Sequence, residues 1–134
     1  MILGIDPGER RVGVAIADEE TRFARPLETI DMRETDLVTR LKEIIAERGV
    51  SRLVVGRPVG LSGIEGPAMD AQKTFLVRLR SEIDIEMDVY DERLTTIIAD
   101  RQMKEAGTGQ ERRKEMRDAI AATVMLQGYM DSKR

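Results

Sequence analysis

The chain opens with three short hydrophobic runs separated by polar turns. The runs occupy residues 2–6, 12–18 and 23–30, and glycine, proline or charged residues lie between them. Short runs joined by tight turns predict an antiparallel meander of three strands. Pro26 weakens the third run, because proline cannot donate a hydrogen bond to a neighbouring strand.

Helical spacing of hydrophobic residues begins after the meander. Gly49 is suited to end the first helix, and Thr108 and Glu111 are spaced as a capping box for the last one. Helices after the third and fourth strands imply crossovers to parallel strands. The predicted elements are a helix at 34–48, a strand at 52–56, a glycine-rich loop at 57–66, a helix from Pro67 to about Ile83, a strand at 85–90 ending just before Glu92, a short helix at 94–106 and a final helix to about Met130.

This order predicts an α/β fold built as one domain over residues 1–134. The sheet would be mixed, with three antiparallel strands first, two parallel strands later and helices flanking it. The composition is that of a globular protein, since 41% of the residues are hydrophobic and 35% are charged. No hydrophobic run approaches the roughly 20 residues of a membrane span, and no secretory leader is visible. We therefore expect a cytoplasmic protein without a membrane partner.

The absence of cysteine and histidine narrows the chemistry. It excludes disulfides, thiolate zinc sites, cysteine nucleophiles and serine–histidine–aspartate triads. Any metal site must be made of oxygen ligands, which favours Mg²⁺ or Mn²⁺ over zinc. The net charge of −3 does not by itself indicate a nucleic-acid-binding protein.

Three positions carry carboxylates where the neighbouring residues indicate burial. Asp6 ends the first apolar strand, although Asp-Pro-Gly is also ordinary turn chemistry. Asp118 shares a helical face with Ala122, Met125 and Tyr129, where an unpaired carboxylate is costly and a buried ion pair with arginine is the alternative. At the end of the fifth strand, alternation alone leaves open whether Asp91 or Glu92 faces a site. Gathered together, such carboxylates would bind one or two divalent ions and could hydrolyse phosphodiesters.

Basic and glycine residues border these carboxylates in sequence. The alternative interpretation is that they form solvated faces and a surface loop. Gly8 and Gly13 keep the surface near Asp6 free of side chains, so that a ligand backbone could approach. The candidate phosphate contacts are Arg10, Arg11, Arg57, Ser62, Lys114 and Arg117.

Four segments in order resemble the YqgF family, also called the RuvX or Holliday-junction-resolvase-like family. They are Gly4–Ala15, Val54–Gly66, Asp91–Thr95 and Asp118–Asp131. The resemblance implies an RNase H-like fold, with Asp6, Glu92 and Asp118 as the catalytic and metal-binding set and Arg10 and Arg93 near the scissile phosphate. The chain departs from many relatives at Ser62 and at Met116-Arg117, where a lysine often precedes the last aspartate.

The resemblance also implies a function in 5′-end processing of pre-16S ribosomal RNA, alongside ribosome-maturation factors. One alternative is a resolvase that cuts four-way DNA junctions, which is commonly a homodimer, whereas a monomer would count against it. Another is a non-catalytic nucleic-acid-binding module. Asp6-Pro7-Gly8 also resembles the phosphate turn of actin-like and sugar-kinase ATPases, which need two such domains around one nucleotide.

Overall fold

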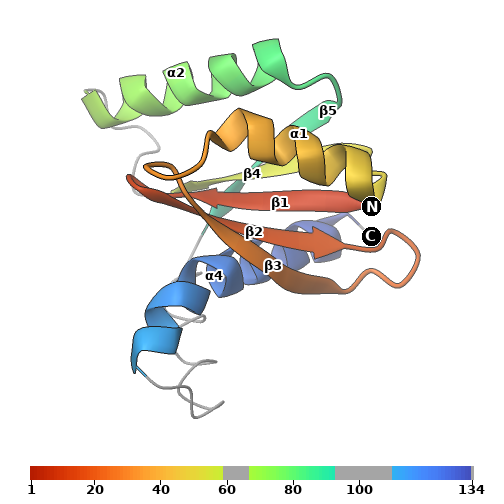
Figure 1. Ribbon diagram of the computed structural model, residues 1–134. Coiled ribbons are helices and arrows are strands. Elements are labelled where there is room, and N and C mark those ends of the chain that lie inside the picture. Colours follow the sequence, from red (N-terminus) through yellow and green to blue (C-terminus); the bar gives the residue numbers. More distant parts are fainter. Residues whose placement is uncertain (59–66, 93–109, 134) are drawn as a thin grey trace.

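The fold is a five-stranded mixed sheet with helices on both faces, seen in a computed structural model that describes residues 1–58, 67–92 and 110–133 (Figure 1). The strand order is β3-β2-β1-β4-β5. The first three strands are antiparallel, and β4 and β5 run parallel to β1, as the sequence predicts. The strands are β1 (Ile2–Pro7), β2 (Arg11–Ala17), β3 (Ala24–Asp31), β4 (Arg52–Pro58) and β5 (Glu86–Glu92).

Helices α1 (Leu37–Arg48) and α2 (Pro67–Glu82) cover one face of the sheet, and α4 (Gln110–Ser132) covers the other (Figure 1). The side chain of Asp36 accepts the Thr39 N–H and so caps the start of α1. Gly49 ends that helix with a left-handed backbone at φ 63°, which confirms the predicted stop. Within the described residues, none of the helices combines the length and the hydrophobicity that crossing a bilayer requires.

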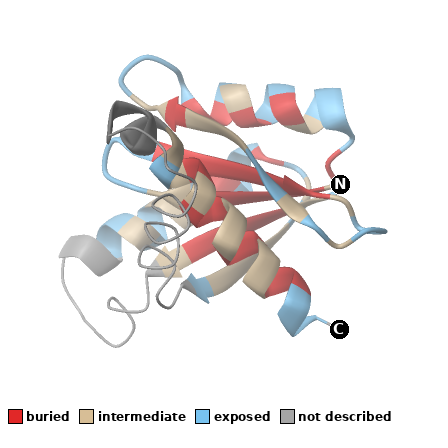
Figure 2. Ribbon diagram, turned by 90° about the horizontal axis from the view of Figure 1, so that it is seen from below, coloured by how far each residue is buried: buried red, intermediate tan, exposed pale blue. Residues whose placement is uncertain are grey.

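Figure 2 shows buried residues along the central strands of the sheet and exposed residues at the ends of the helices. Strand alternation divides the core into two layers. Leu3, Ile5 and the alternate strand residues whose side chains point to the same face of the sheet pack with α1 and α2. Residues that share a face in this way are said to have the same parity. The α4 layer is built from Ile2, Ala15, Val54 and the buried face of the helix, which carries Ala122, Met125, Leu126 and Tyr129. The predicted helical face around Asp118 is therefore the face that meets the sheet.

The carboxyl end of α4 is tied to the sheet by polar contacts. The buried Tyr129 hydroxyl donates a hydrogen bond to the Asp88 carboxylate and accepts one from Arg52 at 3.1 Å. Arg22 donates to the carbonyl of Met130 at 2.5 Å, which satisfies an acceptor at the helix end. These contacts fix the helix at the end remote from Asp118.

Two strands extend further than the sequence predicts. Arg57 was expected to open a loop, and Glu92 was expected to lie just past a strand. Instead β4 and β5 continue side by side, with Arg57 paired to Asp91 and Pro58 to Glu92 in the register. An ion pair of 2.6 Å between Arg57 and Asp91 stabilises this extension. The predicted loop after residue 58, the helix at 94–106 and the Thr108–Glu111 capping box lie outside the residues or side chains described.

Candidate active site

Asp6 and Asp118 come together through Gly13. Asp6 lies near the end of the central strand, where its partner on β2 is Gly13. A Cβ on Gly13 would lie 1.8 Å from the backbone oxygen of Asp118, so the helix backbone rests directly on this glycine. Asp6 has the parity of Ile2 and Gly4, which both face α4. The backbones of Asp6 and Asp118 therefore both lie next to Gly13.

The Asp118 carboxylate is partly buried and lacks a hydrogen-bond donor at one of its oxygens. Its side chain is 28% exposed, and its Oδ2 atom is buried without a hydrogen-bond partner. Arg11 Nε approaches that oxygen to 3.3 Å, which is an ion-pair distance without the alignment of a hydrogen bond. Burial raises the pKa of Asp118, and the charges of Arg11 and Arg117 oppose that rise. A buried carboxylate oxygen without a donor is suited to ligate a cation.

Strand geometry separates Asp91 from position 92. Asp91 forms its ion pair with Arg57, and both residues have the parity of the layer beneath α1 and α2. Asp88 and Tyr90 contact Tyr129 of α4, so the opposite parity belongs to the Asp6 face. Glu92 has that second parity, at the last position of β5. Its side chain lies outside the description, and its part in the site stays a prediction.

No group of three potential metal-ligating side chains is found among the residues whose side chains the structure describes. The described part of the predicted acidic set is the pair Asp6 and Asp118. All donors of the pair are carboxylate oxygens, which is the chemistry that Mg²⁺ and Mn²⁺ select.

The predicted phosphate contacts fall into different environments. Arg10 binds the Asp31 carboxylate through Nε at 3.2 Å and Nη2 at 3.0 Å. This hydrogen bond, together with the backbone N–H of Arg33, lowers the pKa of Asp31. Arg11 and Arg117 lie at Asp118, whereas Arg57 is held on the opposite face. Ser62, Arg93 and the side chain of Lys114 lie outside the described residues.

The sequence predicts that Gly8 and Gly13 leave room for a ligand, whereas in the structure both glycines contact the protein's own backbone. The N–H of Gly8 closes the β1–β2 turn by donating to the Arg11 carbonyl at 2.9 Å. The space above Gly13 holds the backbone of α4, where the sequence interpretation left room for a ligand. A glycine within a strand typically marks such a close approach, but the sequence does not show which backbone approaches. No pattern in the sequence predicts that Asp31 pairs with Arg10.

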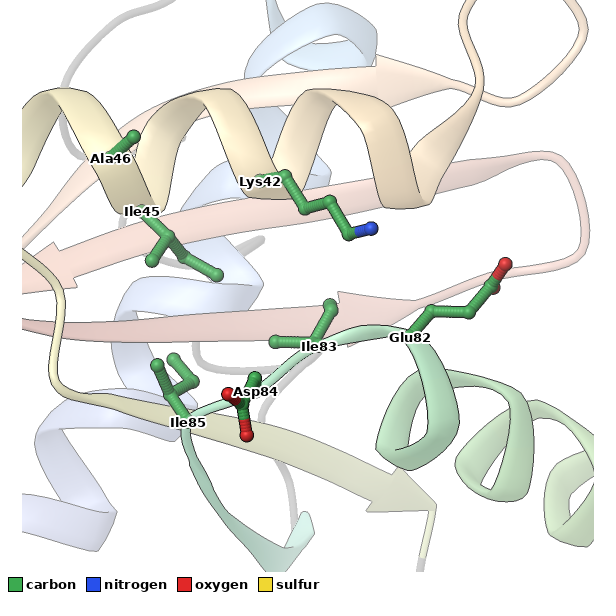
Figure 3. Close-up of a pocket in the computed structure, with 7 residues that line it drawn as sticks. All are labelled: Lys42, Ile45, Ala46, Glu82, Ile83, Asp84 and Ile85. Atoms are coloured by element: carbon green, nitrogen blue, oxygen red, sulfur yellow. The ribbon is translucent and has the colours of Figure 1, made fainter.

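A separate pocket opens on the other side of the sheet (Figure 3). Ile45 of α1 and Ile83 and Ile85 beyond α2 provide its apolar surface. Charged side chains lie around it, from Lys42, Glu82 and Asp84. The sheet separates this pocket from Asp6 and Asp118, so it is not part of the acidic site.

Comparison with solved structures identifies the class of fold. The RuvC protein of Thermus thermophilus, solved in complex with a Holliday junction substrate, aligns with a TM-score of 0.56 at 16% identity, covering 98% of this chain and 94% of that one. A second structure of Thermus thermophilus RuvC aligns with a TM-score of 0.50 at 16% identity, over 98% and 95% of the two chains. The fold is therefore the RNase H-like α/β fold, as the resemblance implied.

Comparison of sequences identifies the family. Residues 1–132 match the family model RuvX, described as Holliday junction resolvase, and the chain belongs to this family. A relative from Chloroflexus aggregans is 40% identical over 99% of this chain and 94% of its own length, and one from Geobacillus kaustophilus is 41% identical over 98% of each. Both carry the name "Putative pre-16S rRNA nuclease". Family membership makes the chain a nuclease-type enzyme that hydrolyses phosphodiester bonds.

Proposed function

We propose that this protein is a divalent-metal-dependent nuclease that trims the 5′ end of pre-16S ribosomal RNA. The observation that carries the proposal is the placement of Asp6 beside Asp118, whose buried Oδ2 lacks a hydrogen-bond donor. The names of the relatives from Chloroflexus and Geobacillus support the choice of substrate. Such a substrate implies a cytoplasmic enzyme that works among ribosome-maturation factors.

The chain's residues would divide the work as follows. Asp6, Asp118 and Glu92 would hold one or two Mg²⁺ or Mn²⁺ ions, which would supply an activated water and stabilise the leaving oxygen. The central strand fixes Asp6, and the contact with Gly13 fixes the backbone of Asp118. Arg11 and Arg117, whose charges act on Asp118, would contact a substrate phosphate, and Arg10, Arg93 and Lys114 would extend that contact. We leave Arg57 out of this set because Asp91 holds it on the other face.

A junction-cutting DNA nuclease is the second candidate, and the description of the matching family favours it. This candidate keeps the same acidic residues and changes the substrate. Symmetric cleavage of two strands calls for two copies of the site, so it predicts a dimer in solution.

The test is cleavage of labelled precursor ribosomal RNA and, separately, of a synthetic four-way DNA junction, with Mn²⁺, Mg²⁺ or EDTA. We expect metal-dependent RNA cleavage that is abolished in Asp6→Asn, Asp118→Asn and Glu92→Gln. Asp91→Asn is the matched control, because it removes a neighbouring carboxylate of the opposite parity, and it should stay active. Paired cuts in the junction alone would select the resolvase. Metal-independent binding without cleavage of either substrate would select the non-catalytic module.

A further inference from the structure

Arg11 approaches Oδ2 of Asp118, the carboxylate oxygen that is buried without a hydrogen-bond partner. It is the first residue of β2, and its side chain is 45% exposed. Its Nε atom lies 3.3 Å from Asp118 Oδ2, but without the alignment of a hydrogen bond. The guanidinium therefore neutralises Asp118 mainly by its charge, and solvent competes for it from the other side.

A divalent ion and this guanidinium compete for the same oxygen. Mg²⁺ sites place their oxygen ligands at about 2.0–2.1 Å from the ion. Such an ion at Oδ2 would stand close to a positively charged group now 3.3 Å from the same atom. Because the Arg11 side chain is exposed to solvent and makes no hydrogen bond to that oxygen, the displacement of Arg11 costs little.

We propose that Arg11 is the counter-cation of the metal-free site, displaced from Asp118 when a divalent ion binds and then available to the substrate phosphate. This inference rests on the proposed metal-dependent function. It adds an exchange of partners, in which Arg11 leaves Asp118 and binds the substrate phosphate. Arg11 is thus a positioning residue for Asp118 in the free protein and a phosphate contact in the loaded one.

The neighbouring arginine provides a matched control. Arg10 forms two contacts of 3.0–3.2 Å with Asp31, on the adjacent strand β3. It carries the same charge in the same turn, yet its partner is not one of the proposed metal ligands. Substituting Arg10 thus removes the same charge without freeing Asp118.

The first measurement is Mn²⁺ binding by calorimetry, without nucleic acid, for the wild type, Arg11→Gln, Arg10→Gln and Arg11→Lys. We expect Arg11→Gln to bind Mn²⁺ more tightly by roughly two- to fivefold, the range set by an exposed ion pair. Arg10→Gln and the charge-retaining Arg11→Lys should stay close to the wild type. Equal tightening in Arg10→Gln and Arg11→Gln would overturn the exchange, because general electrostatics would then explain it. Arg11→Lys with weaker Mn²⁺ binding than the wild type would also overturn it.

The second measurement is the affinity for an RNA hairpin by fluorescence anisotropy, in Ca²⁺ and in EDTA. Arg11→Gln should lose more affinity in Ca²⁺ than in EDTA, because only the ion releases the guanidinium to the phosphate. An equal loss in both conditions would overturn the exchange of partners. The two proposals fail differently: a wild type that binds no divalent ion removes the metal-dependent function itself, whereas a wild type that binds Mn²⁺ as tightly as Arg11→Gln removes only the role of Arg11.

Discussion

The backbone carbonyl of Asp118 rests on Gly13, in the space where any other residue would carry its Cβ. Gly13 is also the strand partner of Asp6. One glycine therefore sets how closely the helix backbone at Asp118 approaches the sheet next to Asp6. The geometry of the acidic pair depends on a contact between two backbones, which no rotamer change can relieve.

Gly13→Ala should accordingly disrupt both the fold and the site. The added Cβ would meet the Asp118 oxygen at 1.8 Å, so α4 must move away from the sheet. We expect a loss of about 3 kcal/mol or more in the free energy of unfolding, together with loss of cleavage. Urea denaturation and the RNA cleavage assay measure the two effects.

Gly4→Ala is the control for placing a methyl group beneath the same helix. Its Cβ would lie 3.0 Å from Leu126 Cβ and 3.2 Å from the two δ carbons, a tight contact that a shift of a few tenths of an ångström relieves. The expected loss is about 1–2 kcal/mol, with cleavage retained. If the two variants were equally stable, the backbone contact at Gly13 would not be the tight point that positions Asp118.

Asp118→Asn should stabilise the metal-free protein while abolishing cleavage. Burial raises the pKa of Asp118 in the folded state, so the fold disfavours its charged form. The stability that this proton contributes is present below the unfolded pKa and is lost as the pH rises through the folded pKa. The melting temperature of the variant should thus match the wild type in acid and exceed it by up to about 4 °C near neutral pH in EDTA.

Added Mn²⁺ should reverse that order, because ligand binding stabilises only the protein that binds it. Asp91→Asn is the control, since its carboxylate pairs with Arg57 at the surface. A difference between Asp118→Asn and the wild type that did not change with pH would show that the Asp118 charge is not the source of the effect.

The sequence predicts the sheet and the pair of aspartates for physical reasons that are local. Asp6 ends an apolar strand, and the spacing of Asp118 with Ala122 and Met125 places it on one helical face, so the neighbouring residues indicate burial for both carboxylates. The mixed topology follows from the order of elements in the same way.

Local sequence patterns do not predict contacts between residues that lie far apart in the chain. The choice between Asp91 and Glu92 depends on which side of β5 faces α4, and this is fixed by the contacts of Asp88 and Tyr90 with Tyr129. The partner of Arg10 is Asp31, on another strand, and no local pattern links the two. Gly13 could be recognised as a point of close approach, but α4 is almost a hundred residues away from it in sequence.

Tyr129→Phe should weaken the protein without affecting the chemistry. The hydroxyl donates to Asp88 and accepts from Arg52, at the end of α4 remote from Asp118. Burial and the hydrogen bond to Asp88 raise the pKa of Tyr129, so the hydroxyl stays protonated at neutral pH. Its removal should cost about 1–2 kcal/mol in urea denaturation and leave the cleavage rate per folded molecule unchanged.

Lys133→Ala provides the comparison for Tyr129→Phe. Its amine lies 5.6 Å from the centre of the Tyr129 ring, at an exposed position. Removing it should change the stability by less than about 1 kcal/mol. A Tyr129→Phe variant as stable as Lys133→Ala would show that the hydroxyl network does not hold the helix.

The salt dependence of nucleic-acid binding should separate the two faces of the sheet. Arg117 lies close enough to Asp118 to influence its pKa, whereas Arg57 pairs with Asp91 on the opposite side. Each phosphate contact that is lost lowers the slope of log affinity against log salt by about one. Measured in EDTA with an RNA hairpin, Arg117→Gln should weaken binding and reduce the slope by about that amount, while Arg57→Gln should leave both close to the wild type. A reduced slope in Arg57→Gln instead would mean that the substrate passes around the edge formed by β4 and β5 and contacts both faces, because Asp91 would then have to release Arg57 to the phosphate.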